Sequence, residues 1–132
     1  AIYFTMSEDD VQRVLRFAGA MIGSDGLPHD PRPHPRLWGT FPRVLGHYSR
    51  DLGLMPLEEA VRRMTGLTAA KFGIKDRGVL RAGAFADVTV FDPATVIDAA
   101  TFEDPIRPSP GIDGVSTGAR SGRALRRDGP IA

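Results

Sequence analysis

An aspartate in a glycine turn, ahead of a long loop of proline, arginine and histidine, is the part of this chain most able to do chemistry. Asp25 follows a short apolar run and lies in the turn at residues 24–26. A carboxylate at the end of a strand, beneath an irregular polar loop, is where α/β folds usually place a general base or a metal-binding group. An isolated Asp-Gly pair is more often a simple turn. The role of Asp25 therefore depends on its surroundings.

Histidines and arginines gather in and behind this loop. The histidines of the chain are His29, His34 and His47. Three histidines suffice for a metal, but their spacing matches no compact zinc-ligand pattern, so a loop or packing role is the simpler interpretation of each. Arginine suits the bidentate recognition of carboxylates. Arg32, Arg36 and Arg43 together hint at an anionic substrate group, although each alone reads as solvated surface.

Composition argues against several classes of protein. The formal net charge is +1 and the arginines are scattered among carboxylates, so no nucleic-acid partner is expected. The absence of cysteine excludes disulfides and thiolate metal sites within this sequence. No apolar run approaches the roughly 20 residues that span a bilayer, and no signal peptide opens the chain, so we expect a cytoplasmic protein without a membrane partner. Ala1 opens the chain in a half-apolar run without an initiator methionine, which suggests a portion of a longer protein.

Local patterns predict the elements that position Asp25. Ser7 offers an N-cap for an amphipathic helix over residues 8–18, with Val14 on its apolar face. Residues 20–23 are too few for periodicity to classify, but a brief buried strand fits the strand–helix–strand order. Repeated prolines then forbid regular structure over residues 24–41. A structureless loop of this length is more often functional than not.

Two further helical regions follow this loop. One helix is predicted after Pro42, ending near Gly53. Another begins at Pro56, because proline suits the first helical position, and its apolar face carries Leu57, Ala60, Val61 and Met64. Gly66 interrupts that helix. A further helical turn is predicted over residues 68–72, with Thr68 as its cap.

The second half of the sequence has the character of β structure. Residues 88–91 predict a strand, and Asp87 is expected to fix the turn before it. A hairpin is predicted within residues 115–127. The change of pattern near residue 75 divides the chain into residues 1–75 and residues 76–132.

Two motifs carry a resemblance to a known family. Gly23-Ser-Asp-Gly-Leu-Pro, with His34-Pro-Arg and Gly39-Thr-Phe-Pro-Arg-Val-Leu-Gly behind it, closely resembles the N-acyl-D-amino-acid deacylases (D-aminoacylases) of the amidohydrolase superfamily. Ala86-Asp-Val-Thr-Val-Phe-Asp-Pro resembles the segment in which an amidohydrolase barrel runs into its small β-sandwich. The resemblance covers roughly residues 1–115.

The resemblance implies an α/β fold, in which residues 1–75 are the last strand–helix elements of a (β/α)8 metal-dependent hydrolase barrel and the remainder is part of a small β-sandwich. Residues 20–24 would be strand eight. Asp25 at its end would take a proton from zinc-bound water and later return it to the leaving amine. Ser24, His34 and Arg36 would help to bind the substrate. The zinc ligands, histidines and a cysteine, would lie upstream of this chain, so that Asp25 alone could contact the metal here.

The enzyme implied by the resemblance hydrolyses N-acyl-D-amino acids to a carboxylate and a free D-amino acid. A barrel of this kind needs on the order of 250 residues, so the chain alone would be inactive without the remainder of the barrel or a homo-oligomeric partner. Leu27 follows Gly26 in place of an arginine, which favours substrates with neutral side chains. Two alternatives remain: an amidohydrolase of cyclic amides, like a hydantoinase or dihydroorotase, and a non-catalytic fragment that completes a partner's barrel.

Overall fold

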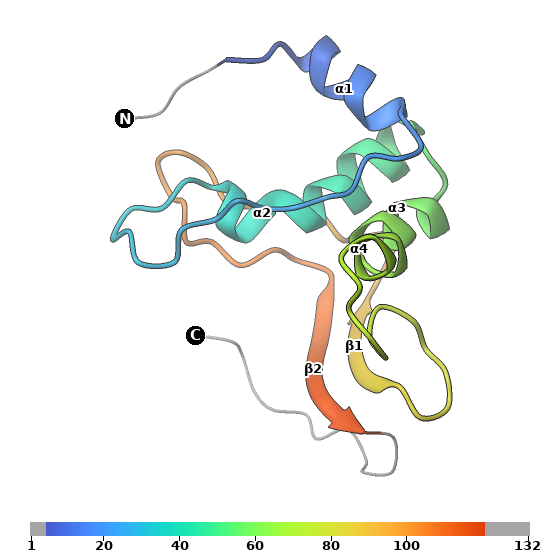
Figure 1. Ribbon diagram of the computed structural model, residues 1–132. Helices are drawn as coiled ribbons and strands as arrows, with labels where there is room; N and C mark the ends of the chain where they lie inside the picture. Colours follow the sequence, from blue (N-terminus) through green and yellow to red (C-terminus); the bar gives the residue numbers. More distant parts are fainter. Residues whose placement is uncertain (1–4, 121–132) are drawn as a thin grey trace.

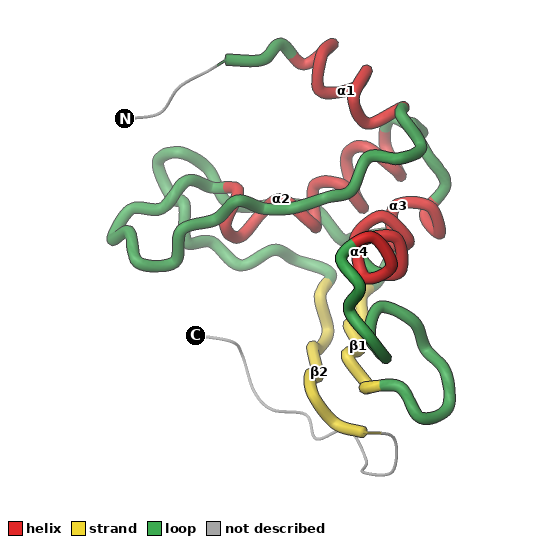
Figure 2. Tube along the Cα trace, in the orientation of Figure 1, coloured by secondary structure: helices red, strands yellow, loops and turns green. Residues whose placement is uncertain are grey.

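The computed structural model describes residues 5–120, with helices in the first half and a two-stranded sheet in the second (Figures 1 and 2). The elements in chain order are α1 (Glu8–Arg16), α2 (Arg36–Arg43), the π-helix η1 (Val44–Asp51), α3 (Leu57–Met64), α4 (Gly66–Lys71), β1 (Phe85–Phe91) and β2 (Ile112–Arg120). Within the described part of the chain, every helix is too short or too polar to cross a bilayer.

Helix α1 begins where its sequence predicts. The hydroxyl of Ser7 accepts the Asp10 N–H at 3.2 Å, so Ser7 is the predicted N-cap. Leu15 is buried in the core and Val11 packs against it. Val14, which was expected on the same face, is instead 53% exposed. The helix ends at Arg16, slightly earlier than predicted.

The strand predicted over residues 20–24 is not formed. This segment is extended, but its backbone joins no sheet; the Ile22 N–H instead donates to the carbonyl of Arg63 at 3.3 Å. A strand needs a neighbouring strand to complete its hydrogen bonds. In the described residues the sheet consists of β1 and β2, and both belong to the other half of the chain.

The irregular loop is shorter than predicted, because α2 begins at Arg36. Pro35 stands at the N-cap, where the fixed φ of proline suits a helix and its missing N–H costs nothing. Pro42 lies inside α2 and cannot donate to the Trp38 carbonyl one turn earlier. The Ser109 hydroxyl donates to that carbonyl at 3.4 Å instead.

The helix predicted after Pro42 is confirmed in extent but is wound as a π-helix. It continues directly from α2 as η1 and stops before Gly53, whose φ of +59° is left-handed. A π-helical stretch commonly follows a local disturbance of the α-helical ladder, and here it follows the proline.

The region of α3 and α4 follows the predicted pattern with one correction. Ala60, on the predicted apolar face of α3, is fully buried. The chain breaks at Thr65, and α4 begins at Gly66 rather than at Thr68. Thr68 therefore caps no helix, and its hydroxyl donates to the Arg63 carbonyl at 2.8 Å.

The core lies where α1, η1 and α3 meet the chain beyond β1. Its buried members are Leu15, Val44, Leu45, Tyr48, Met55, Ala60 and Val96. Gly46 permits the closest approach within it, because a Cβ at this position would lie 2.3 Å from the Val96 carbonyl oxygen. Only glycine lets η1 lie this near to the chain at Val96.

Strands β1 and β2 form an antiparallel ladder in which Thr89 lies opposite Val115. The predicted strand at residues 88–91 is confirmed and begins earlier, at Phe85. Asp87 lies within this strand, where it accepts the Gly118 N–H at 2.8 Å and pairs with Arg77. These bonds, the backbone one first, lower the pKa of the Asp87 carboxyl. Asp87 thus bridges the two strands, rather than holding a turn before β1.

Of the hairpin predicted within residues 115–127, the described residues contain one strand. Residues 112–120 form the single strand β2, which pairs with β1 from the other side of a long connection. Residues 121–127 lie outside the described residues.

The connection between β1 and β2, residues 92–111, is here called the strap. It leaves the sheet, runs beside α2 and returns to β2 (Figure 1). Its first turn is held by Asp92, which accepts the Ala94 N–H and the Thr95 hydroxyl, each at 2.9 Å. Arg50 of η1 donates to the Val96 carbonyl at 2.8 Å. The strap therefore attaches the β unit to the helices.

Candidate functional site

Asp25 stands at the turn between the extended segment and the proline loop. Its φ of +49° lies in the left-handed region, which is uncommon for a residue with a side chain. Its carboxylate is 82% exposed and pairs with the Nη2 of Arg36 at 2.8 Å. The carboxylate is thus accessible and faces a cation from the first turn of α2.

Two local contacts hold this turn against α2. The Ser24 hydroxyl accepts the Gly26 N–H at 3.3 Å and so closes the turn around Asp25. Gly26 lies tightly against α2, because a Cβ there would lie 2.9 Å from the Leu37 Cα. This close packing brings the side chain of Arg36 within reach of the carboxylate.

Arg36 has an unused donor as well as an ion pair. Its Nε is buried and has no hydrogen-bond partner among the described residues. A buried polar group without a partner costs free energy, and native structures rarely retain one without a reason. Because this Nε is covered, a ligand from solvent would meet the exposed part of the guanidinium, which carries the Nη2 that pairs with Asp25 and whose planar donors suit a carboxylate.

His34 supports the start of α2 rather than a metal. Its Nδ1 accepts the Arg36 N–H at 3.1 Å, and its ring meets Phe102 of the strap edge-on at 5.2 Å. Partial burial, and then the positive charge of Arg36, lower the pKa of His34. A neutral imidazole whose Nδ1 accepts carries its proton on Nε2. His34 thus caps the α2 backbone as a neutral ring.

A shallow groove of about 350 Å³ adjoins this arrangement. The loop, α2 and the strap all line it, through His34, Arg36, Thr40, Arg43, Asp98 and Phe102. Arg43, one of the arginines expected near an anion, is paired with Asp98 at 3.2 Å. Arg32 donates to the Glu103 carbonyl at 3.3 Å. Of the three arginines, Arg36 is the one that the structure places beside Asp25.

The structure brings the predicted residues Ser24, Asp25, His34 and Arg36 together at the junction of the loop and α2. The other two histidines make no such contact. His29 is exposed, and the ring of His47 packs edge-on against that of Tyr48, with 4.9 Å between the ring centroids. Across residues 5–120, no three His, Asp or Glu side chains gather in a way that could hold a metal ion.

Sequence reasoning missed the contribution of the strap. Asp98 and Phe102 lie far from the loop in sequence, yet they pair with Arg43 and contact His34 respectively. No local pattern announces such contacts, because they arise only when the strap folds back along α2. Their acidic and aromatic character was the sole signal in the sequence.

Comparison with known proteins identifies the family of the chain. The model of the Amidohydrolase family matches residues 15–122. D-aminoacylase of Alcaligenes xylosoxydans xylosoxydans is 63% identical over 139 residues, which cover 96% of this chain and 29% of that protein. N-acyl-D-glutamate deacylase of the same organism is 50% identical over 143 residues, which cover 100% of this chain and 29% of that protein.

Solved structures agree in fold as well as in sequence. A crystal structure of D-aminoacylase matches with a TM-score of 0.85 and 69% identity, over 87% of this chain and 24% of that one. N-acyl-D-glutamate deacylase from Bordetella bronchiseptica, complexed with zinc and a phosphonate inhibitor, matches with a TM-score of 0.84 and 58% identity over the same shares. The chain thus spans less than a third of the length of these relatives. The resemblance to the D-aminoacylases is confirmed, and the chain belongs to the amidohydrolase family.

Proposed function

We propose that this chain is a portion of a zinc-dependent deacylase that hydrolyses the amide bond of N-acyl-D-amino acids. The observation that carries the proposal is the pairing of an exposed carboxylate, Asp25, with Arg36 in a chain 63% identical to D-aminoacylase. One group can move a proton and the other can hold an anionic substrate. Those are the two tasks that amide hydrolysis of an acylated amino acid requires of residues around a metal.

Asp25 is proposed as the general base and then the general acid. Its exposed carboxylate can accept a proton from the attacking water and give that proton to the nitrogen of the leaving amine. Zinc, when bound, would polarise the amide carbonyl and lower the pKa of water. The described residues offer the metal no set of three ligands, so its ligands are proposed to come from outside this chain.

Arg36 is proposed to bind the carboxylate of the substrate. It already binds one carboxylate through Nη2, and its side chain is 39% exposed, so a substrate carboxylate can reach the same donors. Ser24 and His34 were predicted to bind substrate as well. Their side chains accept backbone N–H groups, so we propose that they act by holding Asp25 and Arg36 in place.

The rest of the fold proposal concerns how the segments of this chain would join the remainder of a longer protein. We propose that residues 1–75 close a (β/α)8 barrel, that residues 20–24 pair as its last strand, and that residues 76–132 belong to a small β-sandwich. The proposal is supported by the extended but unpaired backbone at residues 20–24. Exposed apolar side chains such as Leu27, 66% exposed, offer surface that further elements could cover.

Substitution of Asp25 in the full-length protein tests the proposed function. Asp25→Asn keeps the size of the side chain but removes its capacity to carry a proton, so kcat for an N-acetyl-D-amino acid should fall by about 10²–10⁴-fold. Zinc content, measured by elemental analysis, should stay near that of the wild type. The matched control is Asp30→Asn on the same loop, where the side-chain oxygen accepts the Arg32 N–H and can still do so as an amide. Retained activity in Asp25→Asn would refute the assignment.

A further inference from the structure

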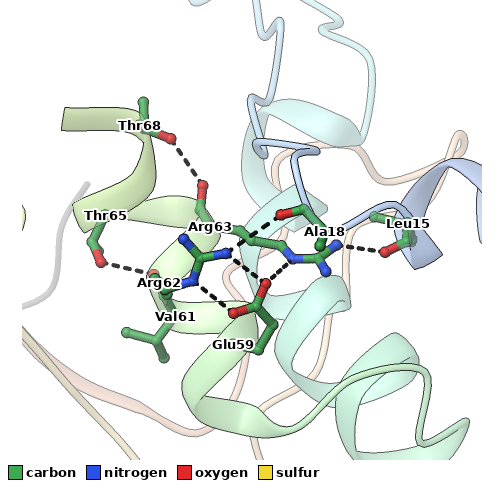
Figure 3. A network of polar contacts seen from close by, with 8 residues as sticks. All are labelled: Leu15, Ala18, Glu59, Val61, Arg62, Arg63, Thr65 and Thr68. Atoms are coloured by element: carbon green, nitrogen blue, oxygen red, sulfur yellow. Dashed lines mark hydrogen bonds and ion pairs between the residues drawn. The ribbon is translucent and has the colours of Figure 1, made fainter. Parts of the chain in front are cut away.

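Helix α3 carries a buried arginine that the proposed chemistry does not use. The side chain of Arg63 is 4% exposed, although arginine is among the residues least often buried. Its Nε donates to Glu59 at 2.7 Å and its Nη1 donates to the Leu15 carbonyl (Figure 3). Glu59 balances the buried charge, and the last turn of α1 receives a donor for a carbonyl that has no partner within its own helix.

The backbone of Arg63 holds the same stretch of chain at a second point. Its carbonyl accepts the Ile22 N–H at 3.3 Å, just ahead of Ser24 and Asp25. The Thr68 hydroxyl donates to the same carbonyl at 2.8 Å and so fixes it at the end of α3. Arg63 therefore contacts the chain both at the end of α1 and close to the candidate base.

These contacts act together with the packing of Ile22 against the core and the hydrogen bond from the Ala20 N–H to the Phe17 carbonyl at 3.0 Å. The backbone at residues 20–24 joins no sheet in the described structure, and the carboxylate of Asp25 is exposed. On the far side, Gly26 packs against the first turn of α2. The position of Asp25 is thus set between two anchors, α2 on one side and Arg63 on the other.

We propose that Arg63 is a positioning residue for Asp25, which clamps the segment from Leu15 to Ile22 onto α3 and so places the carboxylate for proton transfer. The inference rests on the proposed function of Asp25. Arg36 lies on α2 and is held separately, so the clamp should affect the chemical step more than substrate binding. A misplacement of about 1 Å can lower a rate by about 10²-fold.

Only an arginine can contact both Glu59 and the Leu15 carbonyl with one side chain, whereas the backbone contact with Ile22 does not depend on the side chain. The guanidinium presents Nε to Glu59 and Nη1 to Leu15 in different directions, whereas the compact ammonium of lysine is a single point of charge. The neighbouring Arg62 also pairs with Glu59, but its side chain is about half exposed. Its Nη2 donates to the Ala18 carbonyl at 3.4 Å (Figure 3). Arg62 is therefore a matched control for Arg63.

The test compares Arg63→Met with Arg62→Met in the full-length, zinc-loaded protein. Each variant leaves Glu59 paired with the other arginine. Arg63→Met should lower kcat for an N-acetyl-D-amino acid by about 10-fold or more, with KM and zinc content within about twofold. Hydrogen exchange of the Ile22 amide should accelerate. Arg62→Met should leave both kcat and this exchange rate within about twofold of wild type.

Wild-type kcat in a folded Arg63→Met variant, or equal losses in the two variants, would overturn the clamp. If Arg63→Met does not fold, Arg63→Lys is tested in its place. In Arg63→Lys, kcat should fall and hydrogen exchange of the Ile22 amide should accelerate. Wild-type values for both would overturn the inference. Asp25→Asn separates the two proposals. An inactive Asp25→Asn beside a fully active Arg63→Met refutes only the clamp, whereas an active Asp25→Asn refutes the proposed function and, with it, any positioning of Asp25.

Discussion

At the scale of single residues, the site consists of a carboxylate and a guanidinium that hold each other in place. Asp25 and Arg36 approach to 2.8 Å, and because the Asp25 side chain is exposed to solvent the ion pair adds little to stability. Its value lies in arrangement. A substrate carboxylate that binds Arg36 would compete with Asp25 for the same donors and leave the base free to accept a proton.

Replacement of Arg36 tests this role in the full-length protein. Arg36→Lys keeps the positive charge but loses the planar set of donors, so KM for an N-acetyl-D-amino acid should rise by about 10-fold, and Arg36→Met should raise it further. Arg32→Met is the control, because Arg32 is exposed and its guanidinium donates to the Glu103 carbonyl, away from Asp25. Steady-state kinetics measure the effect, and an unchanged KM in Arg36→Met would show that the substrate carboxylate binds elsewhere.

At the scale of elements, polar contacts between helices do much of the positioning. Glu59 on α3 accepts from both Arg62 and Arg63, and these hydrogen bonds lower its pKa from 4.5 to about 2. Through these arginines α3 reaches the end of α1. Protonation of Glu59 would weaken its hydrogen bonds with Arg62 and Arg63 and, with them, the contact between α1 and α3.

The junction between α1 and α3 should therefore depend on pH. Because the pKa of Glu59 is lower in the folded state, its stabilising effect is complete above about pH 4.5 and is lost as the pH falls towards about 2. The free energy of unfolding should thus differ between wild type and Glu59→Gln at neutral pH, and the difference should shrink across that range. Urea unfolding at several pH values measures it. Glu58→Gln, at an exposed position, is the control; a difference independent of pH would contradict the expectation.

At the scale of the whole molecule, the strap joins the helices to the sheet. Arg50 donates to the Val96 carbonyl, Arg43 pairs with Asp98, and Gly46 allows η1 to touch the strap. The strap also contributes Phe102 to the surroundings of His34. The same segment therefore supports both the core and the site.

A side chain at position 46 should separate η1 from the strap. In Gly46→Ala the new Cβ would lie 2.3 Å from the Val96 carbonyl oxygen, so the backbone must shift and the free energy of unfolding should fall by about 1–3 kcal/mol. Gly114→Ala is the control, because a Cβ at Gly114 on β2 would meet nothing within 4 Å. Chemical unfolding of the full-length protein measures both. Equal stability of Gly46→Ala and wild type would mean that the strap moves aside without cost.

Much of the local structure could be predicted from the sequence. The cap at Ser7, the apolar face of α3 and the strand at residues 88–91 depend on neighbours along the chain, and all three are confirmed. The motif around Asp25 led to the right family for a similar reason, because the motif consists of residues that are neighbours along the chain. The turn residues themselves, Ser24 and Gly26, could also be recognised as a turn.

What the sequence could not decide are the contacts between distant segments. The strand expected over residues 20–24 joins no sheet in the described residues, and the strand at Ile112–Arg120 pairs with β1, from which the strap separates it in sequence. Hydrogen bonds of a strand come from a neighbour that may be far away in sequence, so periodicity alone cannot assign them. The same holds for Arg63, whose contacts with Leu15 and Ile22 join segments that are far apart in the sequence. Sequence therefore determined the local elements and the reactive residue types, and only the tertiary structure decided which of them meet.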